Sequence, residues 1–324
     1  MSRALVVEAL SDDLSTLRLM DVAVPAPKRG EVKIRLRAAS VNFPDILMVQ
    51  GKYQLKPDLP FSPGMEGAGD ATVVGDGVTR VRPGDRVVVG ARFGCYAEEI
   101  VVPEQVVRPL PARLDYAQGV AYPAAYLTAY VALTRRGELQ RGETLLVHGA
   151  AGGVGLAAVD VGKLLGARVI ATASSEEKRA FLKSYGADHV LASTGFREAV
   201  KDLTGGKGAD VVYDPVGGDV FDESVRCIAF SGRLLVIGFT SGRIPTVSVN
   251  MPLIKGFSVV GVRAGEYGRQ FPEKGAENIR TIDAWAAEGK IRPHVCAEFP
   301  LERAHEAMRM LQERRVIGKV VLTI

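Results

Sequence analysis

The stretch TLLVHGAAGGVGLAAV, residues 144–159, decides the fold. An apolar run opens it, three glycines follow at a spacing of three (Gly149, Gly152 and Gly155), and a helical pattern closes it. A strand, a glycine turn and a helix in this order predict a dinucleotide-binding loop, although Ala150 stands where the first glycine of the usual fingerprint is expected. The alternative is a purely structural turn between a strand and a helix.

The physical demands of a dinucleotide loop are met by the glycines that remain. Gly152 would let the backbone approach a pyrophosphate, and Gly155 would let the helix pack closely on the strand. The helix N-terminus would offer free N–H groups and a positive dipole end to the phosphates. A phosphate loop of the nucleoside-triphosphatase kind requires Gly-Lys-Ser/Thr before the helix, and Val154-Gly155-Leu156 stands there instead.

The same alternation of buried strand and helix continues after this loop and predicts an α/β fold with a doubly wound parallel sheet of six strands. After the first strand, strands are expected at residues 168–173, 189–192, 209–214, 233–239 and 257–262. Helices are expected between them, at residues 155–166, 176–186, 196–206, 218–232 and, as a short turn, 251–256.

The end of the second expected strand indicates which dinucleotide binds. NAD-binding folds place an acidic residue there for the ribose 2′-hydroxyl. Here the strand ends in Ala173-Ser174-Ser175, and Lys178 follows. Two hydroxyls and a lysine suit a 2′-phosphate, which a carboxylate would repel. The serines also fit a helix N-cap, and both roles are compatible; the missing acid favours NADPH.

Composition and charge exclude several classes of protein. The chain has 324 residues, enough for two domains, with 47% hydrophobic and 24% charged residues. The net charge of +4 comes without a basic stripe, so a nucleic-acid partner is not expected. No apolar run has the length of a membrane span, and the first residues lack a secretory pattern, so a cytoplasmic protein is expected. The three cysteines are too scattered for a zinc site or a disulfide framework.

The segments that flank the expected parallel sheet have different patterns. Residues 1–115 contain short strand-like pieces between Gly, Pro and Asp turns, which predicts a mostly antiparallel β unit. Beyond Arg263 a loop, two helices and a final strand are expected.

Five motifs in order resemble the zinc-free medium-chain dehydrogenase/reductases, and among them the quinone oxidoreductase (zeta-crystallin-like) family. They are AASVNFPDILMVQGKYQ, PFSPGMEGAG, AYPAAYLTAYVAL, HGAAGGVG and GKVVL. The resemblance covers essentially the whole chain. It implies a GroES-like β-barrel domain formed by residues 1–118 and 265–324, a Rossmann domain formed by residues 119–264, an active site between them, and a homodimer or homotetramer. Asn42 and Met65 stand where zinc-dependent relatives have Cys and His, so no metal site is expected.

The resemblance also implies the contacts of the cofactor. Ser193 stands where relatives often have Tyr or His, which would weaken the grip on the 2′-phosphate, and Leu47 stands where several have Tyr. The positions carried over as cofactor-binding are Thr128, Ala151, Gly152, Gly153, Val154, Gly155, Ser174, Ser175, Lys178, Ser193, Val216, Ile237, Gly238, Phe239, Val262, Arg263 and Arg314.

Asn42, Asp45 and Tyr53 match the polar active-site positions of the family and are the candidate catalytic residues. Each has a structural alternative: Asn42 could bond the backbone, Asp45 could cap a helix, and Tyr53 could be a packed aromatic. We expect Asn42 and Tyr53 to orient a substrate carbonyl. His148 is expected to pack beneath the glycine loop.

These observations predict an NADPH-dependent, metal-independent oxidoreductase that transfers hydride to quinones or other α,β-unsaturated carbonyls. Without a Lewis acid, a substrate that is already electrophilic fits best. Two alternatives stay open: an enoyl-thioester or enone reductase, and a catalytically idle NADPH-binding protein. The expected partner is a small-molecule substrate, and neither nucleic acid nor a membrane.

Overall fold

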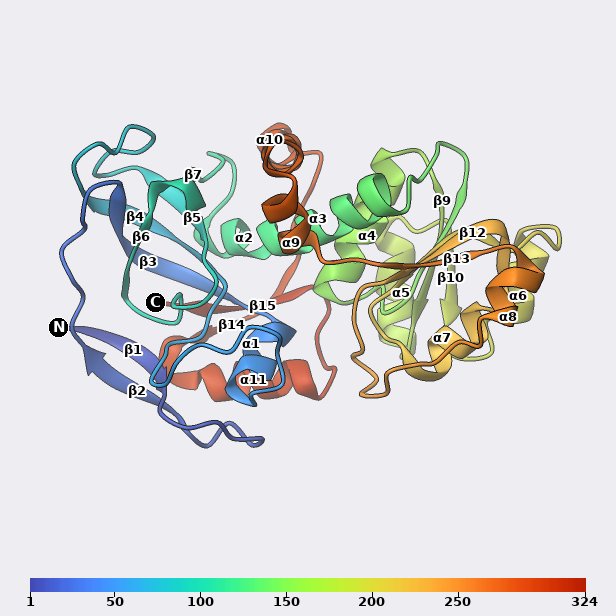
Figure 1. Ribbon diagram of the computed structural model, residues 1–324, viewed down its shortest axis with the longest axis horizontal. Coiled ribbons are helices and arrows are strands. Elements are labelled where there is room, and N and C mark those ends of the chain that lie inside the picture. The colour runs from blue at the N-terminus through green and yellow to red at the C-terminus, as the bar shows by residue number, and fades with distance from the viewer. The chain divides into compact units, whose positions relative to one another are not determined.

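The computed structural model describes all residues, 1–324, and the chain divides into two compact units. The first unit comprises residues 1–124 and 292–324, and the second comprises residues 125–291. Each unit has its own sheet (Figure 1). The expected combination of a mostly antiparallel β unit with a six-stranded parallel sheet is therefore confirmed.

The first unit is built on a seven-stranded sheet in the order β14-β15-β3-β4-β5-β7, with β6 also paired to β3. All its pairings are antiparallel except that of β14 with β15. Its strands are β3 (Glu31–Val41), β4 (Glu66–Val74), β5 (Arg86–Gly90), β6 (Glu99–Pro103), β7 (Val107–Pro109), β14 (Val295–Pro300) and β15 (Lys319–Thr323). A separate antiparallel pair is formed by β1 (Ser2–Val7) and β2 (Leu17–Val22). The helices are α1 (Phe43–Val49), α2 (Tyr116–Ala121) and α11 (Ala304–Gln312).

The second unit contains the parallel sheet, in the order β10-β9-β8-β11-β12-β13. Its strands are β8 (Thr144–Val147), β9 (Arg168–Ala173), β10 (His189–Ala192), β11 (Ala209–Asp214), β12 (Ile228–Val236) and β13 (Ser258–Gly261). Its helices are α4 (Gly153–Leu164), α5 (Glu176–Tyr185), α6 (Arg197–Leu203), α7 (Gly218–Ser224), α8 (Asn250–Lys255), α9 (Ala264–Gln270) and α10 (Pro272–Glu288). Successive strands are added in one direction from β8 to β10 and in the opposite direction from β11 to β13. In such sheets ligands bind beyond the carboxyl ends of the strands, at the position where this direction reverses.

Several segments differ from the secondary structure that the sequence predicts. Beyond Arg263, helix α9 stands where a loop is expected, and strand β14 was not expected. The helix expected over residues 218–232 ends at Ser224, and β12 begins at Ile228, because Ile228 pairs with Ala209 of β11. Helix α3 (Pro123–Tyr130), which continues into a π-helix (Val131–Arg136), was not expected.

The unit boundaries also differ from the domain boundaries expected from the sequence. Residues 265–291 belong to the second unit, as do residues 125–264, whereas residues 119–124 belong to the first. The contacts of α10 explain its place. Arg135 Nε donates to Asn278 Oδ1 at 2.9 Å, and the rings of Tyr130 and Trp285 pack edge to face with centroids 5.4 Å apart.

Candidate functional site

The glycine loop follows β8 in the second unit and enters α4. Gly149 has a φ of 54°, in the left-handed region that favours glycine. Ala150 donates its N–H to Thr172 O at 3.1 Å, and Gly152 donates to Gly149 O at 2.9 Å. Ala150 therefore has an ordinary backbone role, and the left-handed residue that the turn requires is its neighbour Gly149.

The structure accounts differently for glycine at positions 152 and 155. A Cβ on Gly155 would lie 2.3 Å from Gly149 O and 2.7 Å from Ala150 Cα, so the packing of α4 against the loop requires glycine. Gly152 is the N-cap of α4, with a φ of −81° that any residue adopts, and its Cβ would meet only Gly149 O at 3.4 Å. No contact within the protein requires glycine at position 152. The absence of a side chain there leaves space for a ligand to approach the N-terminus of α4.

His148 lies under this loop and links three elements. The ring is fully buried; Nδ1 lies 2.9 Å from Thr172 Oγ1 and Nε2 lies 2.8 Å from Ser224 Oγ. Burial lowers the pKa of His148 to about 3, so the ring is neutral. Ser224 donates its proton to Val220 O, so it accepts from His148 Nε2–H, and Thr172 donates to Nδ1. These bonds hold the loop and account for both ring nitrogens.

The end of β9 carries the residues expected at a 2′-phosphate. Ser175 is the N-cap of α5, and its Oγ accepts the N–H of Lys178 at 3.3 Å, so the capping role is present. Ser174 is exposed. Arg179, which was not among the expected contacts, folds back and donates to Glu176 Oε2 at 2.6 Å.

The other expected cofactor contacts of the second unit lie at the same edge of its sheet, except Thr128. Ser193 follows β10, Val216 follows β11, residues 237–239 follow β12, and residues 262–263 follow β13. Because parallel strands share their carboxyl ends, the structure brings these positions to one edge. Thr128 lies in α3, and Arg314 lies in the first unit.

Asp214 shapes this edge of the sheet and was not among the residues predicted from the sequence. The side chain is buried, and its Oδ1 accepts the N–H groups of Val216 and Gly217 at 2.8 and 2.9 Å. Desolvation raises the pKa of Asp214 despite these bonds. An Asp followed by Pro and Gly at a strand end is a turn signal, and it could have been used.

A buried polar network surrounds Asn42 in the first unit. Asn42 Oδ1 accepts from Lys319 Nζ at 2.6 Å, and Asn42 Nδ2 donates to Glu66 Oε2 at 2.9 Å. The other Glu66 oxygen accepts the N–H of Ala124 at 2.6 Å. Glu66 and Lys319 were not expected here; their signal is a charged residue at the start of a strand that otherwise consists mostly of small or apolar residues.

Asp45 is enclosed in the same unit. Its side chain is 0% exposed, and Oδ2 accepts from Asn42 N at 2.9 Å and from Tyr96 Oη at 3.1 Å. Burial raises the pKa of Asp45 to about 7, against the lowering effect of these two bonds. This placement supports the capping alternative, because a substrate cannot reach the buried carboxyl.

Tyr53 follows α1 and packs, half-buried, against the core of the first unit. Its N–H donates to Leu47 O at 3.2 Å. Asn42, Asp45 and Tyr53 are therefore gathered at the two ends and within the first turn of α1.

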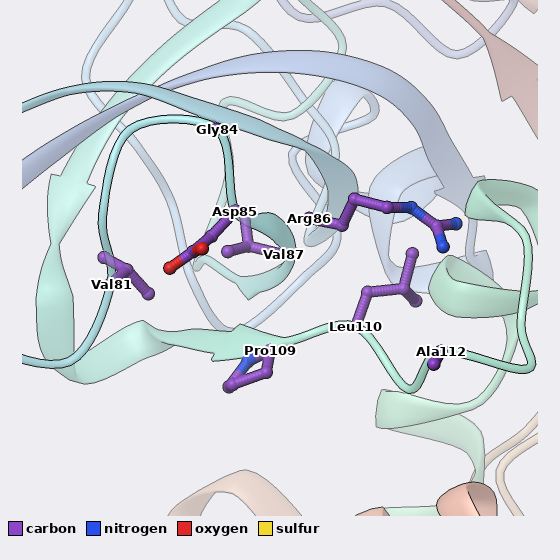
Figure 2. Close-up of a pocket in the computed structure, with 8 residues that line it drawn as sticks. All are labelled: Val81, Gly84, Asp85, Arg86, Val87, Pro109, Leu110 and Ala112. Atoms are coloured by element: carbon purple, nitrogen blue, oxygen red, sulfur yellow. The ribbon is translucent and has the colours of Figure 1, made fainter.

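One pocket lies apart from all the expected site residues. It is lined by Val81, Gly84, Asp85, Arg86, Val87, Pro109, Leu110 and Ala112 (Figure 2). Arg86 donates to Leu114 O at 3.0 Å and lies over the ring of Tyr116, so its charge has structural partners. No group of three or more His, Cys, Asp or Glu side chains is arranged to hold a metal ion.

Comparison with known proteins identifies the class. Residues 28–112 match the family model "Alcohol dehydrogenase GroES-like domain", and residues 153–281 match "Zinc-binding dehydrogenase". A GroES-like unit with a six-stranded parallel-sheet unit defines the medium-chain dehydrogenase/reductases.

Individual relatives within this class of proteins include several quinone oxidoreductases and related proteins. The quinone oxidoreductase-like protein 2 homolog of Nematostella vectensis is 39% identical over 90% of this chain and 81% of its own. A probable oxidoreductase from Mycobacterium abscessus superimposes with a TM-score of 0.89 and 39% identity, over 100% of this chain and 99% of its own. Escherichia coli quinone oxidoreductase, solved in complex with NADPH, superimposes with a TM-score of 0.91. It is 29% identical, and the superposition covers 99% of this chain and 100% of its own. The chain belongs to the medium-chain dehydrogenase/reductase family, with quinone oxidoreductase-like relatives.

No helix in the structure combines the length and the apolar character needed to cross a membrane.

Proposed function

We propose that the protein is a metal-independent oxidoreductase that uses NADPH to reduce quinones or other α,β-unsaturated carbonyls. The observation that carries the proposal is the open backbone at Gly152, where α4 begins. Helix N-termini bind phosphate, and here no protein contact explains the glycine. The NADPH complex of the Escherichia coli relative supports the same cofactor.

The residues at the sheet edge fit this cofactor. When bound, NADPH would supply the hydride. The N-terminus of α4 would hold the pyrophosphate, and Ser174, Ser175 and Lys178 would hold the 2′-phosphate. Asn42 and Tyr53 would donate hydrogen bonds to the substrate oxygen, which gains negative charge as the hydride arrives. Asp45 would act through the backbone of Asn42 and not by touching the substrate.

The proposed function is tested by steady-state NADPH oxidation with three panels: quinones such as benzoquinone and menadione, simple enones, and crotonyl thioesters. Turnover of quinones or simple enones supports the proposal. Turnover confined to the thioesters would favour the enoyl-thioester reductase, and tight NADPH binding without turnover would favour the idle binding protein.

Lys178→Ala is expected to weaken NADPH binding roughly 10- to 100-fold and to leave NADH binding unchanged. The reason is the loss of one charge-assisted contact with the 2′-phosphate, worth ~1.5–3 kcal/mol. Fluorescence titration of both cofactors measures this, with Lys183→Ala, an exposed lysine of the same helix, as the control. Equal losses for NADPH and NADH in Lys178→Ala would contradict the assignment.

Tyr53→Phe is expected to lower enone turnover ~100-fold and quinone turnover much less, because a quinone is electrophilic without help from a donor. NADPH affinity should stay unchanged. Tyr116→Phe, which removes a phenol bonded to Asp70 at 2.5 Å in the same unit, is the control. Wild-type turnover of both substrates in Tyr53→Phe would identify Tyr53 as a packing residue.

The proposal includes a homodimer formed through the second unit. Strand β13 is an edge of the parallel sheet, and large apolar side chains beside it are exposed: Leu253 82%, Ile254 72% and Phe230 79%. Phe230 lies against Gly256, which follows α8, the helix that carries Leu253 and Ile254. An exposed apolar edge of this kind is protected in native proteins, and a second copy would cover it.

Leu253→Asp is therefore expected to convert the dimer to a monomer, because the interface would have to bury a charge. Light scattering coupled to size exclusion measures the mass. Leu164→Glu, on α4 of the same unit, should leave the mass unchanged. A monomeric wild-type protein would refute this interface.

A further inference from the structure

The side-chain amide of Asn42 has one permitted orientation. Its partners include a lysine, which can only donate, and a carboxylate, which can only accept. A flip of the amide would turn its NH₂ group toward the ammonium and its oxygen toward the carboxylate. Both contacts would then be repulsive.

The fold brings these three side chains together from distant parts of the chain. Strands β15, β3 and β4 are neighbours in the sheet, and Val320 pairs with Val41. Lys319 at the start of β15 therefore lies beside Asn42, which follows β3, and Glu66 begins the next strand. The Lys319 and Glu66 side chains are 7% and 3% exposed, and their charged atoms are 3.5 Å apart. The charges thus compensate each other inside the unit.

The network leaves Asn42 with one proton to give. The Nδ2 atom carries two protons, and Glu66 Oε2 accepts one of them. Asn42 itself is only half-buried, so the second proton is available to a ligand. A cation bonded to the amide oxygen also polarises the amide and strengthens its N–H groups as donors.

We propose that Lys319 is a positioning residue for the reaction. Together with Glu66 it fixes the Asn42 amide so that the second Nδ2 proton is directed to the substrate oxygen. This inference rests on the proposed function, and within that function it assigns the orientation of the donor to a residue at the far end of the chain.

The test is a double-mutant cycle on enone reduction. Lys319→Met removes the charge and keeps an unbranched side chain; we expect kcat to fall ~10- to 100-fold with KM changed less than about threefold. In an Asn42→Ala background, the same Lys319→Met change should lower kcat less than about threefold further, because the residue it positions is gone. Lys33→Met is the matched control: Lys33 pairs with Glu99 at 2.8 Å in the same sheet and does not touch Asn42, so kcat should not change.

A second variant separates positioning from folding. Lys319→Met alone leaves the Glu66 carboxylate buried without its cation, which destabilises proteins. Lys319→Met combined with Glu66→Gln removes both charges, and we expect it to recover the thermal stability of the wild type but not its kcat. Recovery of kcat together with stability would overturn the proposal.

A readout that needs neither cofactor nor turnover comes from side-chain amide NMR of the cofactor-free protein. The Asn42 NH₂ signal, assigned by its loss in Asn42→Ala, should show one proton shifted downfield by the carboxylate. It should broaden or collapse in the charge-free double variant. An unchanged signal there, or additive losses of kcat in the cycle, would overturn the positioning role while the wild type still reduces enones. A wild type that reduces neither enones nor quinones would instead overturn the proposed function.

Discussion

Gly155→Ala is expected to destabilise the second unit by about 3 kcal/mol and to reduce NADPH binding more than 100-fold. The added methyl group would lie 2.3 Å from Gly149 O and 2.7 Å from Ala150 Cα. Both of these atoms belong to the backbone, so no side chain can rotate away, and overpacking of this kind costs ~1–3 kcal/mol or more. The loop must move, and the N–H groups at the start of α4 move with it. Urea unfolding and fluorescence titration of NADPH measure the two effects.

Gly152→Ala is the matched comparison three residues earlier. Its Cβ would lie 3.4 Å from Gly149 O, an ordinary contact, and its φ of −81° suits alanine. We expect a change in stability of less than about 1 kcal/mol, because only the mild N-cap preference for glycine is lost. NADPH binding should still fall at least ~10-fold, because the methyl group occupies the approach to the helix N-terminus. Full NADPH affinity in Gly152→Ala would contradict the dinucleotide site.

The parallel sheet could be predicted because its signals are local. Each strand is a short apolar run that ends at glycine or a polar turn, and β8 with its glycine loop shows the whole pattern within residues 144–159. The error at residues 228–232 has a long-range cause: Ile228 extends β12 by pairing with Ala209, and nothing near Ile228 in the sequence encodes that partner. Helix α3 was missed because its sequence is apolar on most sides and so lacks a helical periodicity.

In the candidate site, too, the features that depend on neighbouring residues could be predicted, and those that depend on distant residues could not. The packing role of Gly155 and the capping alternative for Ser175 follow from neighbours in sequence, and the structure contains those contacts. The partners of Asn42 could not be predicted from its neighbours in sequence. Lys319 lies 277 residues away and contacts Asn42 only because β15 pairs with β3. A charged residue in a buried strand indicates that a partner exists but does not identify it.

Asp45→Asn is expected to change the pH dependence of stability, with an effect of the order of 4 kcal/mol across the titration. Burial raises the pKa of Asp45 from 3.8 to about 7, with Glu66 adding to the rise and Lys319 opposing it. Between these two pH values the folded protein holds a proton that the unfolded chain releases. The free energy of unfolding therefore falls as pH rises from about 4 to about 7, by ~1.4 kcal/mol per pH unit at most, and levels off above pH 7.

The Asp45→Asn variant lacks this proton, so its stability relative to the wild type should increase from pH 5 to pH 8. Urea unfolding at each pH measures the difference. Glu98→Gln provides a control of opposite sign: hydrogen bonds from the Arg3 backbone and guanidinium lower the pKa of Glu98, so its contribution is present at neutral pH and is lost on acidification. The loss of stability of Glu98→Gln relative to the wild type should therefore appear as pH rises. A pH-independent loss of stability in Asp45→Asn would show that the Asp45 carboxyl acts only as a hydrogen-bonded cap whose protonation does not change on folding.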